Sequence, residues 1–216
     1  MLKIENVAHM NGEQWLMVVR GARNPMNSWD KMDSTIKDDG VIRIGHNDFD
    51  LLMRLRKAGT EHCKYLRKVV VWIDMTAPFY FWKQFDTYKI GTVCDSCSTM
   101  HKLTYKPFEL KDFSWERLSD DGIDTLEHVI VDLNDCRELY LRAVEDECER
   151  DKKDLFDEMI QLLPTSYNQK RSIMLNYKVL ADMYQQRKNH KLGEWHTFCN
   201  WIESIPYSEL IIGETK

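Results

Sequence analysis

A long run of apolar residues at helical spacing dominates the sequence from Asp124 toward Glu149. The residues that share one face of this predicted helix are Leu126, Val129, Ile130, Leu133, Tyr140 and Ala143. The charge-rich stretch that follows, residues 145–154, is typical of a solvated helix face or of a junction between helices. A second helix ending at Pro164 is predicted from Leu155, Phe156, Met159, Ile160 and Leu163. We therefore expect a long helical C-terminal half.

The rest of the chain mixes strand and helix patterns. Residue types predict a strand over residues 14–19 and a central strand over residues 69–73, followed by a helix that begins near Pro78. A loop is expected from Gly91 to His101, because this stretch is rich in Ser, Thr and Cys and has no period. Further helices are predicted at residues 48–55, 177–190 and 194–202. Together these elements indicate an α+β domain.

Composition favours one folded domain over residues 1–216, since 43% of the residues are hydrophobic and 30% are charged. No apolar run approaches the length of a membrane span and the N-terminus lacks a signal pattern, so a cytoplasmic location is expected. The six cysteines do not form a small-domain framework and are expected to be reduced thiols. A formal net charge of −5 disfavours duplex nucleic acid as a partner, whereas a few local cations suffice for a small anion.

Four stretches, in the same order along most of the chain, resemble the flavin-dependent thymidylate synthase family. They are Arg20–Arg23 with Gly59–His62, then Ala77–Gln84, then Leu163–Pro164, and finally Asn176–Leu180 continuing through Arg187 to Trp195. Within them, Ala77 and Pro78 are similar to the start of the family helix that carries a glutamine, here Gln84. The resemblance implies a thymidylate synthase-complementing-protein-like fold, with a central, mostly antiparallel sheet flanked by helices.

The signature segment of the family, RHRxxSxNExSxR, is met here by residues 87–99 and differs from them strongly. Lys89 alone keeps a positive charge there, Ile160 replaces a further family arginine, and Arg187 matches a family arginine on the phosphate side. Arginine binds phosphate through a fork of two hydrogen bonds, so the loss of several arginines is expected to cost several kcal/mol of nucleotide affinity. Cations that could compensate are Lys89, His101, Lys102 and Arg171.

The resemblance also implies an activity, a methyltransferase of nucleotide biosynthesis. It implies FAD as cofactor, dUMP or a related pyrimidine nucleotide as substrate, methylenetetrahydrofolate and NADPH as co-substrates, and a homotetramer. The implied cofactor-binding residues are His62, Lys89, Asn176 and Lys178, and the implied substrate-binding residues are Gln84, Ser98 and Arg187. No catalytic side chain is assigned, because the cofactor supplies the difficult chemistry, and no metal is expected.

Several of these candidates also have an ordinary structural explanation. Gln84 could be a helix-surface amide, Asn176 a helix cap, and His62 a partly buried polar group. Cys94 and Cys97 have the C-x-x-C spacing of zinc and redox sites, but one pair is weak evidence and a polar loop with reduced thiols is favoured. The competing function is a non-catalytic binding or assembly protein that keeps the tetrameric scaffold without FAD and dUMP chemistry.

Overall fold

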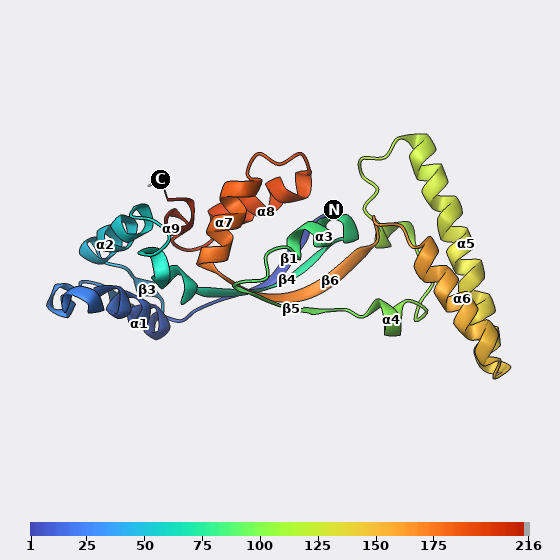
Figure 1. Cartoon of the computed structure of the whole chain (residues 1–216), viewed down its shortest axis with the longest axis horizontal. Coiled ribbons are helices and arrows are strands. Elements are labelled where there is room, and N and C mark those ends of the chain that lie inside the picture. The colour runs from blue at the N-terminus through green and yellow to red at the C-terminus, as the bar shows by residue number, and fades with distance from the viewer. Residues whose placement is uncertain (214–216) are drawn as a thin grey trace. The chain divides into compact units, whose positions relative to one another are not determined.

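The computed structural model describes residues 1–213, and within them the chain has an α+β architecture (Figure 1). The main sheet has the strand order β1-β4-β6-β5, and β2 and β3 form a separate antiparallel pair. The strands are β1 (Lys3–His9), β2 (Thr35–Ile36), β3 (Ile42–Arg43), β4 (Val70–Pro78), β5 (Thr92–Ser96) and β6 (Asn168–Asn176). The α-helices are α1 (Gly12–Arg23), α2 (His46–Lys57), α3 (Phe79–Phe85), α4 (Thr99–Lys102), α5 (Asp120–Glu145), α6 (Glu149–Leu162), α7 (Tyr177–Arg187), α8 (Gly193–Ser204) and α9 (Glu209–Ile212). The 3-10 helices are η1 (Asn24–Met26), η2 (Trp29–Lys31), η3 (Cys63–Arg67) and η4 (Leu110–Asp112).

Backbone hydrogen bonds at both ends of β4 give the direction of its pairing with β6. The amide of Tyr177 donates to the carbonyl of Val69 at 2.9 Å, and the amide of Phe79 donates to the carbonyl of Tyr167 at 3.0 Å. A later residue of one strand therefore meets an earlier residue of the other, which is the antiparallel pattern. This confirms the antiparallel sheet expected from the resemblance.

The chain folds into two compact units built from interleaved segments. One unit contains residues 1–3, 75–86 and 95–171, and the other contains residues 4–74, residues 87–94 and the chain from Ser172 onward. The single domain predicted from the sequence stays a prediction.

The hairpin of α5 and α6 confirms the strongest pattern in the sequence (Figure 1). Helix α5 begins after Ser119, whose side chain accepts a hydrogen bond from the amide of Gly122, and it ends at Glu145. Glu147, with a φ of 56°, turns the chain into α6. The buried core of this unit consists of Leu103, Phe108, Phe113, Leu126, Ile130, Leu133, Cys136 and Met159. The helical period therefore identified both helices and the faces that they bury.

The strand predicted over residues 14–19 is wrong, because these residues lie inside α1. The side chain of Asn11 accepts a hydrogen bond from the amide of Gln14, and the Gln14 side chain accepts one from the amide of Asn11. This reciprocal capping box starts a helix. Trp15, Val18 and Val19 are then buried on one helical face. A short apolar run fits either a strand or a helix, and here the cap decides between them.

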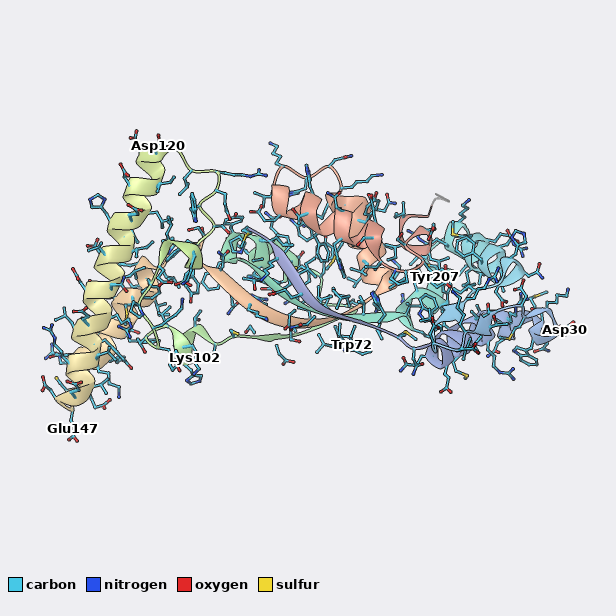
Figure 2. All side chains as sticks on the ribbon, turned by 180° about the vertical axis from the view of Figure 1, so that it is seen from behind. Asp30, Trp72, Lys102, Asp120, Glu147 and Tyr207 are labelled. Atoms are coloured by element: carbon cyan, nitrogen blue, oxygen red, sulfur yellow. The ribbon has the colours of Figure 1, made fainter. Side chains whose placement is uncertain are left out.

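The predicted central strand is confirmed and is longer than expected, since β4 continues to Pro78 and α3 follows directly. Burial alternates along it: Val71, Ile73 and Met75 are buried, whereas Trp72 is 40% exposed (Figure 2). This alternation is that of a strand covered on one face only.

The loop predicted from Gly91 to His101 is wrong, because the segment contains β5 and the short helix α4. Its backbone pairs with β6: the amide of Asn176 donates to the carbonyl of Gly91 at 3.0 Å. The strand lies at the end of the sheet and its side chains are mostly exposed, so it needs no apolar alternation. Strand β6 itself was not predicted.

The three remaining helix predictions are confirmed, since residues 48–55, 177–190 and 194–202 correspond to α2, α7 and α8. Among residues 1–213, no helix is both long enough and apolar enough to cross a membrane.

Candidate functional site

The C-terminal end of α7 holds an arginine against aromatic rings. Arg187 is the last residue of α7 and is half-buried. Its guanidinium carbon lies 4.9 Å from the ring centre of Trp195 and 5.5 Å from that of Tyr88, both within the range of a cation–π interaction. Trp195 is fully buried near the start of α8, so its ring has a fixed position beside Arg187.

The hydroxyl group of Tyr88 orients the same guanidinium. Arg187 Nε donates to Tyr88 Oη at 2.9 Å, and Tyr88 Oη donates to Gln186 Oε1 at 2.8 Å. The phenol thus uses its only proton toward Gln186 and accepts the Nε proton of Arg187. The terminal nitrogens Nη1 and Nη2 of Arg187 remain for an external anion, and this pair is one of the geometries in which arginine binds phosphate.

The positive charges of Arg187 and Lys89 are not neutralised by a carboxylate in the described part of the chain. Neither Arg187 nor Lys89 forms an ion pair with a carboxylate of residues 1–213. Lys89 follows Tyr88 in the chain and is exposed. A guanidinium whose terminal nitrogens have no carboxylate partner can bind an anion through both of them. The arrangement is therefore suited to an anion.

The histidine after α7 is affected both by burial and by the positive charges near it. The pKa of His190 lies below its usual range because of partial burial and because Arg187, His196 and Lys191 repel a proton there. In the unprotonated ring, Nδ1 accepts a hydrogen bond from the amide of Leu192 at 3.1 Å. A bound anion would lower the repulsion and raise this pKa.

Asn176, predicted to bind the cofactor, caps α7. Its side-chain oxygen accepts a hydrogen bond from the amide of Val179 at 2.9 Å. The Asn176 side chain also lies against Gly91, where an added Cβ would come within 2.6 Å of Asn176 Nδ2. Gly91 has a φ of +93°, which side chains rarely adopt, so both backbone and space require glycine here. The structure therefore fixes the segment after Tyr88 against the N-terminus of α7.

The other two predicted cofactor residues of this unit have different surroundings. Lys178 is half-buried and forms an ion pair with Asp182, one turn further along α7. His62 is exposed at the turn before η3, and its backbone amide donates to the carbonyl of Gly59 at 3.1 Å. The side chain of Lys178 is thus occupied within its own helix, whereas that of His62 faces solvent.

Gln84 and Ser98, predicted to bind the substrate, belong to the unit that contains α5 and α6. Gln84 is half-buried in the last turn of α3. Ser98 is the N-cap of α4, and its hydroxyl accepts a hydrogen bond from the amide of His101 at 3.3 Å. In the other unit, Asn176 and Arg187 contact the segment of residues 87–94, which contains Lys89.

Arg171, one of the cations considered as a replacement for the missing arginines, is already paired. Its Nη1 lies 2.7 Å from Asp86 Oδ1, and its Nε donates to Gln169 Oε1 at 2.9 Å. The guanidinium also lies over the Trp82 ring, 4.2 Å from its centre. Arg171 is therefore a poor candidate for a phosphate ligand. Lys102 contacts the Tyr105 ring at 4.3 Å, and His101 is exposed.

The C-x-x-C spacing does not produce a paired site. Cys94 lies in β5 and Cys97 directly follows this strand. Because a strand advances about 3.3 Å per residue, their Cα atoms are about 10 Å apart, beyond the reach of a disulfide. No group of three or more metal-ligating side chains is close enough to hold a metal ion anywhere in residues 1–213.

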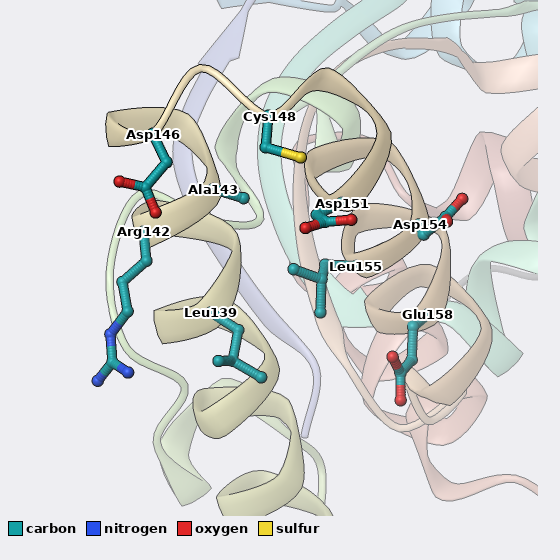
Figure 3. Close-up of a pocket in the computed structure, with 9 residues that line it drawn as sticks. All are labelled: Leu139, Arg142, Ala143, Asp146, Cys148, Asp151, Asp154, Leu155 and Glu158. Carbon is teal, nitrogen blue, oxygen red and sulfur yellow. The ribbon is translucent and has the colours of Figure 1, made fainter.

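A groove between α5 and α6 has the wrong charge for a nucleotide (Figure 3). It has a volume of about 530 Å³, and Leu139, Ala143 and Leu155 form its apolar part. The polar groups around it are Arg142, Asp146, Asp151, Asp154 and Glu158. Four carboxylates against one guanidinium would repel a phosphate. None of the predicted site residues lies in this groove.

Sequence reasoning does not identify three contributors to the Arg187 site. Tyr88 lies in the segment that departs from the family signature, and no sequence pattern points to Gln186. Trp195 enters the sequence analysis only as the end of a family-like stretch, yet it is fully buried and its ring contacts Arg187. The sequence signal for Tyr88 was an aromatic residue, next to Lys89, at a position where the family signature has a different side chain.

Comparison with known proteins gives a match in structure but not in sequence. No protein-family model matches the sequence, and no curated protein sequence matches it either. In structure, the chain is similar to thymidylate synthase X (ThyX) from Helicobacter pylori with FAD and dUMP, with a TM-score of 0.64 at 14% identity, covering 99% of this chain and 96% of that chain. A second structure of that flavin-dependent enzyme, also complexed with FAD and dUMP, gives a TM-score of 0.61 at 15% identity, with 99% and 97% covered.

The chain is also similar to the UMP/dUMP methylase PolB from Streptomyces cacaoi, bound with 5-Br dUMP. The TM-score is 0.60 at 13% identity, and the match covers 94% of this chain and 89% of that chain. Matches over nearly the whole length of each chain confirm the fold that the four sequence stretches implied. The chain is therefore a divergent protein with the fold of the flavin-dependent thymidylate synthases.

Proposed function

We propose that this protein binds a pyrimidine nucleoside monophosphate with its phosphate group on Arg187. The modification that we propose is methylation of dUMP, or a related change to the pyrimidine, with FAD, methylenetetrahydrofolate and NADPH. The observation that carries the proposal is the arginine itself: it is held by Tyr88 and Trp195 and has no carboxylate partner in the described chain.

The chemistry of Arg187 supports a phosphate as its ligand. The Nε atom is engaged by Tyr88, so an anion is bound by the two terminal nitrogens, which match two oxygens of a phosphate. Lys89 adds a second, exposed charge next to Tyr88. A neutral ligand would leave both charges unneutralised. The fold is shared with enzymes solved with dUMP or 5-Br dUMP, which favours a pyrimidine nucleotide as the source of the phosphate.

The residues predicted to hold FAD fit it in part. His62 and Lys89 have exposed side chains, which suit the ring system and the diphosphate of a flavin nucleotide. The side chains of Asn176 and Lys178 already bond within α7, so we assign them to positioning the helix. When bound, FAD would carry the electrons for reduction of the transferred carbon group. The protein would orient the nucleotide through Arg187.

A non-catalytic scaffold is the second candidate, and the altered signature segment favours it. Residues 87–99 contain no arginine, and β5 presents mostly exposed Val, Cys, Asp and Ser side chains. A protein of this kind would keep the fold and lose both FAD and dUMP. The expected cytoplasmic location and homotetramer belong to the proposal in either case, and light scattering would test the assembly.

Visible absorbance separates the two candidates. Purified protein is mixed with FAD, freed of excess flavin and titrated with dUMP. The proposed enzyme retains a flavin band that dUMP perturbs, and the Arg187→Ala variant retains the band but needs at least tenfold more dUMP for the same perturbation. Arg150→Ala is the matched control, because Arg150 is exposed and pairs only loosely with Asp154 at 3.9 Å. A protein without retained flavin or dUMP response would support the scaffold.

A further inference from the structure

We infer that Tyr88 is the positioning residue of the phosphate site: it stands where the family signature has a different side chain, and it holds Arg187 in the orientation that receives the anion. This inference rests on the proposed function only for the identity of the anion. The contacts that carry it lie within one compact unit of the chain, because residues 87–94 and the segment from Ser172 onward belong to the same unit.

Tyr88 limits which edge of the Arg187 guanidinium can bind an anion. An arginine can offer a phosphate either Nε with one terminal nitrogen, or the two terminal nitrogens. Tyr88 Oη accepts the Nε proton at 2.9 Å, which removes the first option. The anion is therefore received by Nη1 and Nη2 only. This gives the site one binding geometry in place of two.

The phenol of Tyr88 is itself held in place. Tyr88 Oη donates to Gln186 Oε1 at 2.8 Å, so its proton points away from Arg187 and its lone pair points toward Nε. The Tyr88 ring lies 6.1 Å from the Trp195 ring in an edge-to-face arrangement. The backbone beyond Tyr88 is held at Gly91 by Asn176. The phenol therefore has both ends fixed, as a positioning group requires.

An arginine that is already held in place binds an anion with a smaller loss of entropy. A free arginine side chain loses much rotamer freedom when it binds an anion, and a held one loses little. A site with a single half-buried arginine depends on this smaller entropy loss more than a site with several arginines does. Removing the Tyr88 hydroxyl while keeping its ring, as in Tyr88→Phe, is therefore expected to weaken dUMP about tenfold, which corresponds to about 1.4 kcal/mol.

Two measurements test the inference independently. The first needs no ligand: hydrogen exchange of the Arg187 Nε proton is followed by NMR, with the signal assigned by its loss in Arg187→Lys. Exchange in Tyr88→Phe should be at least tenfold faster than in the wild type. Tyr105→Phe is the control, because Tyr105 is 75% exposed and belongs to the other unit. Unchanged exchange in Tyr88→Phe would overturn the inference, whether or not dUMP binds.

The second measurement is a double-mutant cycle on dUMP affinity. If Tyr88 acts through Arg187, the double variant Tyr88→Phe/Arg187→Ala binds dUMP as weakly as Arg187→Ala alone. If the two losses multiply, Tyr88 acts on the ligand directly and the positioning role is overturned. A wild-type protein that binds no dUMP would defeat the proposed function, and the exchange measurement would still decide the role of Tyr88.

Discussion

The carboxylate of Asp48 offers a sharp test of how this fold is held together. Asp48 is completely buried and accepts hydrogen bonds from Arg23 Nε at 2.6 Å, from Ser34 Oγ at 2.6 Å, and from the amides of Asp33 and Ser34 at 3.0 and 2.8 Å. Arg23 is itself 4% exposed. One buried carboxylate thus joins the end of α1, the loop at residues 33–34 and the start of α2.

The substitution Asp48→Asn keeps the shape of the side chain and removes its charge. It leaves the Arg23 guanidinium buried without a counter-charge, a change that typically costs about 3–5 kcal/mol of folding free energy. With a urea m-value of about 2–3 kcal/mol per molar for a chain of this size, the unfolding midpoint should fall by about 1–2.5 M. Removing the buried guanidinium as well, as in Arg23→Met/Asp48→Asn, should destabilise less than Asp48→Asn alone, because no charge is left buried and the carbonyl of the introduced asparagine still accepts from Ser34 and the backbone amides.

The stabilisation by Asp48 depends on pH, and the direction of its pKa shift decides how. Burial raises the pKa of Asp48, but the hydrogen bonds from Ser34, Arg23 and the backbone outweigh it, so the pKa lies below its ordinary value. The stabilisation is therefore complete above the pKa of the unfolded carboxyl, about 4, and is lost as the pH falls through the lower pKa of the folded state. The gap between wild type and Asp48→Asn should accordingly shrink in acid.

The control for this experiment lies on the same helix. Asp50 pairs with Arg54 at 3.0 Å, but their side chains are 57% and 69% exposed. Asp50→Asn should change stability by less than about 1 kcal/mol, as exposed ion pairs usually do. Equal urea midpoints for Asp48→Asn and Asp50→Asn, measured by circular dichroism, would refute the stabilising role of the buried carboxylate.

Three further outcomes are expected. On addition of dUMP, the pKa of His190 followed by NMR should rise from its lowered value, because the phosphate offsets the repulsion from Arg187; a constant pKa would place the anion elsewhere. Gly91→Ala should lower the free energy of unfolding by at least about 1 kcal/mol in urea titrations, since it combines a φ of +93° with a 2.6 Å approach to Asn176 Nδ2, and an unchanged midpoint would contradict this. Mild oxidation should leave Cys94 and Cys97 unlinked within the chain, and a peptide mass spectrum containing that disulfide would show that β5 is not extended there.

The sequence predicted the fold best where a periodic apolar pattern was long. The face of α5 carries Leu126, Ile130 and Leu133 over several turns, so only a helix buries them together. The pattern failed at α1 because six residues do not distinguish the two periods, and the deciding feature, the capping box of Asn11 and Gln14, is not a periodic signal. It failed at β5 because an edge strand satisfies its backbone through a neighbour and places few demands on its side chains.

The candidate site was predictable only in part. Arg187 came from the resemblance, and its lack of a carboxylate partner in the described chain required the structure. The same holds for Arg171, which looked equally available in the sequence and is neutralised by Asp86. Two residues 85 positions apart in the chain meet only after folding, and no local pattern reports that distance. The fold, and not the local sequence, therefore decides which of these arginines has a carboxylate partner.

The missing arginines and the Tyr88 contact have a common physical explanation. A site with several guanidinium groups can bind a phosphate well even if each side chain is mobile, because each charge-assisted hydrogen bond contributes about 1.5–3 kcal/mol. A site with one guanidinium has no such surplus, so the entropy lost on fixing that side chain weighs directly on the affinity. Holding Arg187 with Tyr88 and Trp195 before the ligand arrives reduces this loss. In the proposed site, holding Arg187 in place before the ligand binds would therefore offset part of the affinity lost with the arginines that the signature segment lacks.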